Sequence, residues 1–523
     1  MINFLRKYYQ HFFLLALVFR VENILLFSGM NIDKAIQLAA TFNFKHGHGI
    51  MLSMSNVSEF LRTEYTPFYG WPPGFTLILT PLYLLVDNLI MVNRMMDVFF
   101  IIVFFFASRS IINRLFESQR KEILAAFCLL STFSFSPYYY YTSTDLYALS
   151  IFVVSLSPIY DFLKGTKKGV VHSFLIAFLL CLCTSIRFAY LPVALIIPCV
   201  LILIGRKDNN SSLAKNGLVT FLFSIVMVNG LYIFQKHYYG SGSYLEHSKF
   251  ALHPENFLQT DPFIFKTYFF IDTFVAKINS NNILKISLLS FEIIISSFIL
   301  LFFMKDIYSR RLEKSTLINF EILSLSVFLT ICGMLAFLSL ISPTQSFTGE
   351  SSWTYVKETR YYAPAIFFIQ LFVSKMIFNP NKRSLTLLFK TFAIFSFSMS
   401  IIYFSFKHYK LIVKHDKEGT FNYDLREPLA LLQILKKSNQ QQQPIIVATK
   451  NETMGTLSIL SNGIPVSNYD SLLLHGKSLL SDKIIYLECE QPLNNFQKLF
   501  LSETKSKFIF SLGKNDWYLI KSK

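Results

Sequence analysis

A few ionisable side chains lie within or beside the long apolar stretches of this sequence, and they are the positions where chemistry could take place. Arg20 and Glu22 fall inside the first apolar stretch, and Asp33 follows it closely. Ionisable groups are costly at membrane depth, so such positions are candidate functional sites. A carboxylate can accept the proton of a hydroxyl group, and a guanidinium can hold two phosphate oxygens at once. The same two kinds of group recur near the ends of later apolar stretches, at Arg94, Asp97, Asp145, Arg187 and Arg360.

The composition indicates which elements must position these side chains. The chain has 523 residues, of which 53% are hydrophobic and 15% are charged, and its mean hydropathy is +0.43. Such values are typical of a polytopic membrane protein, whose helices each need about 20 predominantly apolar residues to span the hydrocarbon. The net charge of +17 comes from Lys and Arg clustered between apolar stretches, as in cytoplasmic loops. We therefore expect membrane lipids as neighbours and no nucleic-acid partner.

The apolar stretches predict about eleven transmembrane helices. Arg6 and Lys7 precede the first of them, and no small-residue cleavage site follows it, so we interpret it as a retained signal-anchor. The predicted spans cover residues 8–29, 91–112, 122–140, 143–162, 170–187, 189–205, 217–236, 285–304, 319–341, 360–378 and 388–406.

Segment 73–88 is apolar, but we do not expect it to cross the membrane. It is short, and prolines such as Pro73 and Pro81 remove backbone donors that hydrocarbon cannot replace. If it stays on the outer face, the N-terminus and every basic loop are cytoplasmic, as the positive-inside rule requires. If it crosses, the later basic loops all lie outside. We therefore predict a juxtamembrane or re-entrant helix here, an external C-terminus, and a multi-pass protein of the cell's inner (plasma) membrane.

The C-terminal part of the chain is polar and has apolar runs of strand length. We predict two domains, a transmembrane domain over residues 1–406 and an external (periplasmic) domain over residues 407–523. The pattern at 426–437 predicts an amphipathic helix, and the composition of 439–444 predicts a polar turn. A small external α/β domain follows from the strands expected at Ile445–Thr449, Lys483–Leu487, Phe508–Leu512 and Trp517–Ile520.

Short motifs near the outer ends of the predicted spans resemble those of a known enzyme family. In order, they are Asp33–Phe42, Gly47–Gly49, Trp71–Gly74, Thr144–Leu146, Arg187–Tyr190 and Glu358–Pro364. The first three resemble the first external loop of GT-C glycosyltransferases, membrane enzymes that use lipid-linked sugar donors. The protein O-mannosyltransferases and the lipid A aminoarabinose transferases are similar. The resemblance covers most of the membrane part and implies a polytopic α-helical, GT-C-like fold with external juxtamembrane helices.

The resemblance implies a glycosyltransferase that moves a sugar from a polyprenyl-phosphate donor to a hydroxyl of a glycan, lipid or protein acceptor. The reaction would take place on the external face, with inversion. Phosphate is already a competent leaving group, so the transfer reaction needs only a carboxylate base and cations that hold the phosphate. Glycosidases, by contrast, also need a general acid. Asp33 is the expected base, and Asp145 is the second catalytic candidate, orienting the acceptor or an arginine. The residues expected to bind the lipid phosphate or sugar are Arg94, Arg187, Arg360, Tyr361, Glu358 and Trp71.

The sequence departs from the family pattern in one respect that matters. Lys34 and Ala35 stand where many relatives have an acidic or aromatic residue soon after the loop aspartate. The donor class and the need for a divalent cation are therefore left open, and we assign no metal ligands. The chain also lacks a Trp-Trp-Asp type of motif, which disfavours transfer of a whole oligosaccharide to protein.

Other interpretations compete with this one. A transporter or lipid-linked-sugar flippase would show inverted repeats and charges deep within several spans, and a structural membrane protein could use boundary charges merely as anchors. Several individual residues also have simpler structural explanations. Arg94 and Asp97, at spacing i,i+3, could form a local ion pair. Arg187 could extend to lipid headgroups, and Trp71 could belong to an interfacial belt. His46 and His48 are better explained by a Gly-rich turn than by a metal site.

Overall fold

The computed structural model describes most of the membrane part and a sheet near the C-terminus. The described residues are 2–26, 32–55, 63–67, 71–134, 144–167, 169–239, 250–252, 300–343, 359–377, 445–449, 466–468, 484–504, 506–512 and 515–521, with a few single positions between them.

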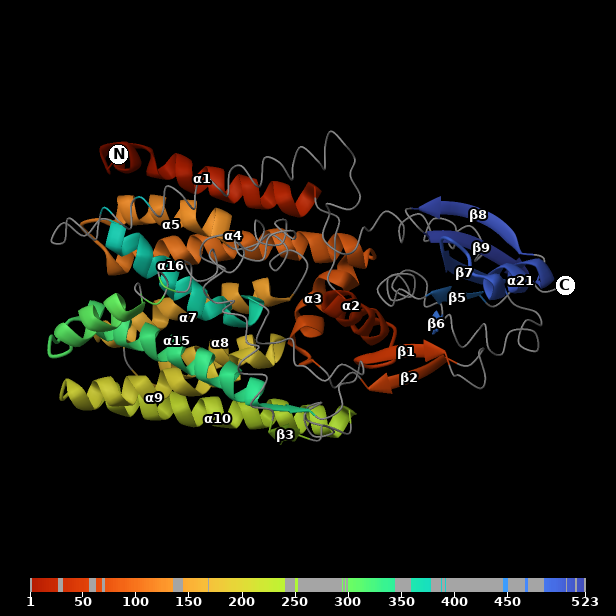
Figure 1. Ribbon diagram of the computed structural model, residues 1–523. Coiled ribbons are helices and arrows are strands. Elements are labelled where there is room, and N and C mark those ends of the chain that lie inside the picture. Colours follow the sequence, from red (N-terminus) through yellow and green to blue (C-terminus); the bar gives the residue numbers. More distant parts are fainter. Residues whose placement is uncertain are drawn as a thin grey trace.

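Long helices lie side by side in a bundle (Figure 1). They are α1 (Ile2–Leu26), α4 (Leu89–Leu115), α5 (Arg120–Ser134), α7 (Asp145–Lys164), α8 (Val170–Ile186), α9 (Leu191–Lys207), α10 (Ser211–Tyr239), α15 (Thr316–Leu340) and α16 (Ala363–Ile377). Among the described residues, five helices are long and apolar enough to cross a membrane: α4, α7, α10, α15, and α9 with the short turn before it. The polytopic helical class is thus confirmed. The number of spans stays a prediction, because most of 285–304 and 388–406 lies outside the described residues.

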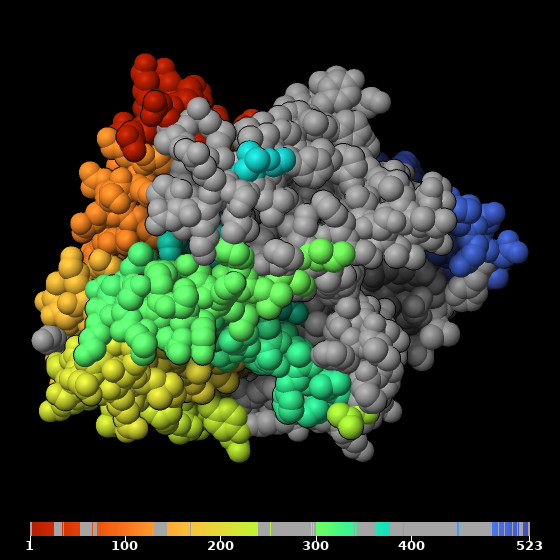
Figure 2. All heavy atoms as spheres, turned by 60° about the vertical axis from the view of Figure 1, so that its left-hand side comes forward, coloured from red at the N-terminus to blue at the C-terminus, as the bar shows by residue number. Residues whose placement is uncertain are grey.

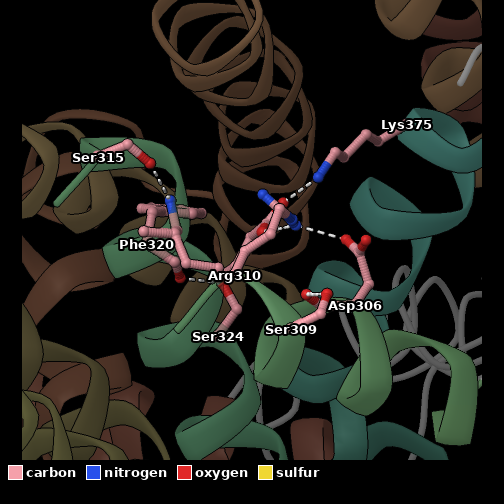
Figure 3. Close-up of polar contacts among 9 residues, drawn as sticks. Asp306, Ser309, Arg310, Ser315, Phe320, Ser324 and Lys375 are labelled. Carbon is pink, nitrogen blue, oxygen red and sulfur yellow. Dashed lines mark hydrogen bonds and ion pairs between the residues drawn. The ribbon is translucent and has the colours of Figure 1, made fainter. Parts of the chain in front are cut away.

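One end of the bundle carries the ion pairs of the basic loops, and we call it the basic end. Arg6 of α1 pairs with Glu122 of α5, and Arg114 of α4 pairs with Asp161 of α7 at 2.8 Å. Figure 3 shows a second group, in which Arg310 contacts Asp306 and lies close to Lys375 of α16. Both cations also pair with one carboxylate, that of Glu321 on α15.

Helices α9, α10 and α15 form a further layer of the bundle. Figure 2 shows the green segment around α15 lying on the yellow α9 and α10. Near the basic end, Lys207 of α9 donates a hydrogen bond of 2.9 Å to Asn319 of α15. In the α9–α10 hairpin, a Cβ at Gly205 would lie 2.4 Å from the backbone nitrogen of Ala214, so only glycine allows this close approach.

The opposite end, which we call the loop end, carries the segment between α1 and α4. This segment contains α2 (Ile32–Lys45), the antiparallel strands β1 (Met51–Ser55) and β2 (Thr63–Pro67), and α3 (Gly74–Leu85). Later parts of the chain contribute the short 3-10 turns η1 (Phe188–Tyr190) and η4 (Thr359–Tyr362). They also contribute the short antiparallel strands β3 (Phe250–Leu252) and β4 (Ile341–Pro343). In Figure 1 the C-terminal sheet lies beyond the same end.

Helix α3 does not cross the bundle. Near its start, Thr76 accepts a hydrogen bond of 3.2 Å from Thr41 of α2, and near its end Tyr83 accepts one of 3.2 Å from Lys45, also of α2. Its first residue, Gly74, packs directly on the end of α8, where an added Cβ would lie 2.3 Å from the Ser185 hydroxyl. Helix α1 therefore ends, and α4 begins, at the same end of the bundle, as expected for a segment 73–88 that stays on one side.

This arrangement predicts the accessibility of the first turn of α4. A Met91→Cys variant should react with a membrane-impermeant thiol reagent added outside intact cells, because Met91 is 53% exposed at the loop end. The matched control is Glu117→Cys, an exposed position at the basic end, which should react only after the membrane is opened. Labelling of the wild-type protein gives the background. Labelling of Met91→Cys only from the cytoplasm would contradict the predicted orientation.

The C-terminal sheet has five strands in the order β6-β5-β7-β9-β8. Strand β5 (Ile445–Thr449) is parallel to β6 (Val466–Asn468) and β7 (Ile484–Glu490), whereas β9 (Asn515–Lys521) is antiparallel to β7 and β8 (Lys507–Leu512). Helix α21 (Asn495–Glu503) covers it through Phe500 and Leu501. The four strands expected from the sequence are confirmed, while the helix at 426–437, the turn at 439–444 and the boundary at 406/407 lie outside the described residues.

Candidate site at the loop end

Two of the predicted site residues form a buried ion pair at the loop end. Asp145 is the first residue of α7, and Arg187 directly follows α8. Arg187 Nε lies 3.1 Å from Asp145 Oδ1, and the two side chains are 3% and 2% exposed. The guanidinium also lies over the ring of Tyr361, 5.4 Å from its centroid. The structure thus brings together Asp145, Arg187 and Tyr361, and Arg187 does not extend to the lipid headgroups.

The Asp145 carboxylate has acceptor capacity beyond this ion pair. Within the described part of the chain, both of its oxygen atoms are buried and accept no hydrogen bond, although Oδ1 lies at ion-pair distance from Arg187. Its place at the start of a helix adds a favourable interaction with the positive end of the helix dipole. The carboxylate can hold the Arg187 guanidinium in a fixed orientation through the ion pair.

Asp33 lies on a helix that is hydrogen-bonded to the residue before Asp145. It is the second residue of α2, and its side chain lies outside the described residues. One turn later, Gln37 donates a hydrogen bond of 3.4 Å to Thr144, the residue before Asp145. Because residues four apart share one face of an α-helix, position 33 is on the same face of α2 as Gln37, which bonds to the N-cap residue of α7.

Lys34 forms a second buried ion pair, which the sequence did not suggest. Its Nζ lies 2.6 Å from Asp97 Oδ1, with side chains 0% and 4% exposed. Tyr147 donates a hydrogen bond of 2.8 Å to the same oxygen, and Asn93 donates one of 3.3 Å to the other. Burial lowers the pKa of Lys34, and the Asp97 carboxylate opposes this effect. The cation bonded to Asp97 is therefore Lys34 of α2, while the half-buried Arg94, the local partner considered as an alternative, interacts with this carboxylate electrostatically.

For some of the remaining predicted site residues, the structure does not describe the side chain. Arg360 precedes Tyr361 in η4, but its side chain, like all of Glu358, lies outside the described residues. Trp71 is half-buried and packs on the small cluster around Ala40 and Ile50. Its carbonyl accepts a hydrogen bond of 3.3 Å from Gln235 of α10, so Trp71 fixes the start of the Pro-Pro-Gly turn.

The histidines of the external loop form part of a turn. Gly47 and Gly49 have φ values of +83° and +78°, which favour glycine, and His48 stacks on the Tyr65 ring with centroids 4.1 Å apart. Over the described part of the chain, no three His, Cys, Asp or Glu side chains come together as a metal site.

Comparison with known proteins gives similarity only to solved structures. No protein-family model matches the sequence, and no curated protein matches it. The structure is similar to an archaeal oligosaccharyltransferase, AglB from Archaeoglobus fulgidus, in complex with an inhibitory peptide and a dolichol-phosphate. The TM-score is 0.49 at 10% identity, over 92% of this chain and 69% of that one. It is also similar to ArnT from Cupriavidus metallidurans bound to undecaprenyl phosphate, with a TM-score of 0.45 at 10% identity, over 98% of each chain.

Proposed function

We propose that the protein is a GT-C glycosyltransferase that moves a sugar from a polyprenyl-phosphate donor to an acceptor hydroxyl. The observation that carries the proposal is the hydrogen bond that joins α2, which has Asp33 in its first turn, to Thr144, the residue next to the buried Asp145–Arg187 pair. The sequence motifs of the external loop support the same assignment. A carboxylate base and a phosphate-binding guanidinium are the groups that this reaction needs.

In the proposed reaction each residue has a separate task. Asp33 takes the proton of the acceptor hydroxyl as its oxygen attacks the anomeric carbon, and the bond from that carbon to the phosphate oxygen breaks. Arg187 and Arg360 hold the phosphate, because guanidinium groups stay charged and bind phosphate oxygens in pairs. Asp145 orients Arg187. Direct displacement of this kind inverts the anomeric centre.

The distribution of buried charge favours this proposal over a transporter. Among the described residues of the helix bundle, the buried Asp, Glu, Lys and Arg side chains lie towards the loop end, as do Arg20, Lys34 and Asp145, or at the basic end, as do Glu122 and Glu321. A transporter is expected to bind its substrate near the middle of the membrane, between discontinuous helices. A site at one end suits a substrate whose reacting group lies at the membrane surface.

The proposal includes an orientation and a domain division. The loop end faces the outside of the plasma membrane, because the other end carries the clustered Lys and Arg. Residues 407–523 form an external domain on the same side as the site. The acceptor, a glycan, lipid or protein, reaches the site from this side.

Arg360 provides a test of phosphate binding. In proteoliposomes supplied with a labelled polyprenyl-phosphate sugar, Arg360→Lys should raise the KM for the donor by about tenfold, because lysine keeps the charge but loses the planar fork. Arg360→Ala should raise it further. Arg311→Lys, at an exposed position of the basic end, is the matched control. Transfer by Arg360→Ala with wild-type kinetics would remove Arg360 from the site, and no transfer by the wild-type protein from any such donor would contradict the proposed function.

A further inference from the structure

The first turn of α2 is attached to the helix bundle by a buried charge. Lys34 follows Asp33 directly, and its side chain is fully buried and bonded to Asp97 of α4. Apolar side chains alone could attach such a helix to the bundle, and Leu38 and Ala39 do so further along α2. An ion pair at this position therefore calls for an explanation.

Three elements meet at the Asp97 carboxylate. It accepts hydrogen bonds from Lys34 of α2, Tyr147 of α7 and Asn93 of its own helix. Tyr147 is itself fixed, because its ring stacks on Phe100 with centroids 4.2 Å apart. The Lys34 ammonium also lies 5.4 Å from the centre of the Tyr147 ring. Helices α4 and α7 thus fix the position of the Asp97 carboxylate, and the carboxylate in turn fixes the position of Lys34 Nζ.

A buried ion pair of this kind specifies geometry better than it adds stability. Moving two charges out of water is costly, and their attraction offsets the cost only when the geometry and the additional hydrogen bonds are good. Apolar side chains of similar size often stabilise a protein equally well. They would, however, allow the helix to rotate or slide by a fraction of a turn, which a bonded ammonium does not.

We propose that Asp97 is a positioning residue: by bonding to Lys34 it fixes the rotation and height of the first turn of α2, and with it the neighbouring Asp33. This inference rests on the proposed function, since it concerns the base of that reaction. The hydrogen bond from Gln37 to Thr144 fixes the next turn of α2. The two contacts together attach the first turn of α2, which includes Asp33, to Asp97 and to Thr144, the neighbour of Asp145 along the chain.

The test separates positioning from stability by removing both charges together. Asp97→Asn alone leaves the Lys34 ammonium buried without its counter-ion and should lower the melting temperature. In the double variant Lys34→Met/Asp97→Asn no charge is stranded, and the new amide can still accept the Tyr147 hydrogen bond. Its amino group has an acceptor nearby, Asn93 Oδ1, which accepts no hydrogen bond within the described part of the chain. The double variant should therefore melt close to the wild-type temperature.

The expected result is a loss of rate without a loss of stability. The kcat of the double variant should fall by about 10- to 100-fold, because a displacement of about 1 Å in a reacting group can cost that much. The KM for the donor should change less than twofold. The control is Arg114→Met/Asp161→Asn, which removes an ion pair at the basic end and should leave kcat unchanged. If the Lys34→Met/Asp97→Asn variant melts normally and transfers sugar at the wild-type rate, the pair is needed neither for stability nor for positioning, and the proposal is wrong.

A second measurement does not depend on the transfer assay. Amide hydrogen exchange over residues 32–41 should be faster in the double variant than in the wild type, while exchange in α9 stays the same. Unchanged exchange in α2 would also contradict the positioning role. Absence of transfer by the wild-type protein, combined with faster exchange in the variant, would overturn the proposed function but leave the attachment of α2 by Asp97 intact.

Discussion

Asp33→Asn is expected to lower the rate of sugar transfer by about 10²–10⁴-fold, the usual contribution of a general base. Asparagine keeps the shape and hydrogen-bonding capacity of aspartate but cannot take up the acceptor's proton. The contacts that hold this part of α2 come from Lys34, Gln37 and Thr41, so the variant should fold normally. Initial rates of transfer in proteoliposomes, with melting temperatures of the same samples, measure both effects.

The matched control for this variant is Asp87→Asn. Asp87 also lies at the loop end, its side chain is 86% exposed, and it pairs with Lys45. The same change of carboxylate to amide there should leave the transfer rate near that of the wild type. A well-folded Asp33→Asn protein with normal activity would show that the base is another group, and Asp145 would be the next candidate.

Much of the fold could be predicted because it depends on the composition of the sequence and on the spacing of its apolar residues. Apolar stretches marked the helices, and the basic loops indicated that segment 73–88 stays at one end, where the structure places α3. The strands β5, β7, β8 and β9 had clear apolar runs. Strand β6 has only three residues and α21 only nine, so neither was found, although the capping box of Asn494 and Gln497 was a usable signal for α21.

The pairing of the charged residues could not be predicted in the same way. The sequence placed Asp145 and Arg187 at one level, but it could not show that they bond, because α7 and α8 separate them along the chain. The partner of Asp97 could not be predicted for the same reason. Its local neighbour Arg94 offered a helical i,i+3 partner, whereas the actual partner, Lys34, is 63 residues away. Charge spacing identifies local pairs, and only packing decides between a local and a distant cation.

Arg187→Leu is expected to abolish transfer and to destabilise the protein by about 3–5 kcal/mol, the usual cost of removing one partner of a buried ion pair. The cause is the Asp145 carboxylate, which would stay buried without the guanidinium that now lies 3.1 Å away. Thermal or denaturant unfolding in detergent measures the stability, and the proteoliposome assay measures transfer. Arg311→Leu serves as the control, because an exposed arginine at the basic end should change stability by no more than about 0.5 kcal/mol.

The double variant Asp145→Asn/Arg187→Leu separates the structural effect from the functional one. Without a buried charge to compensate, it should regain most of the lost stability. Transfer should nevertheless stay low, because the guanidinium that holds the departing phosphate is gone and a neutral leucine cannot replace it. If the double variant regains both stability and normal transfer, the Asp145–Arg187 pair only joins α7 to α8, and the phosphate must be held by other cations at the loop end, with Arg360 and Arg94 the first to examine.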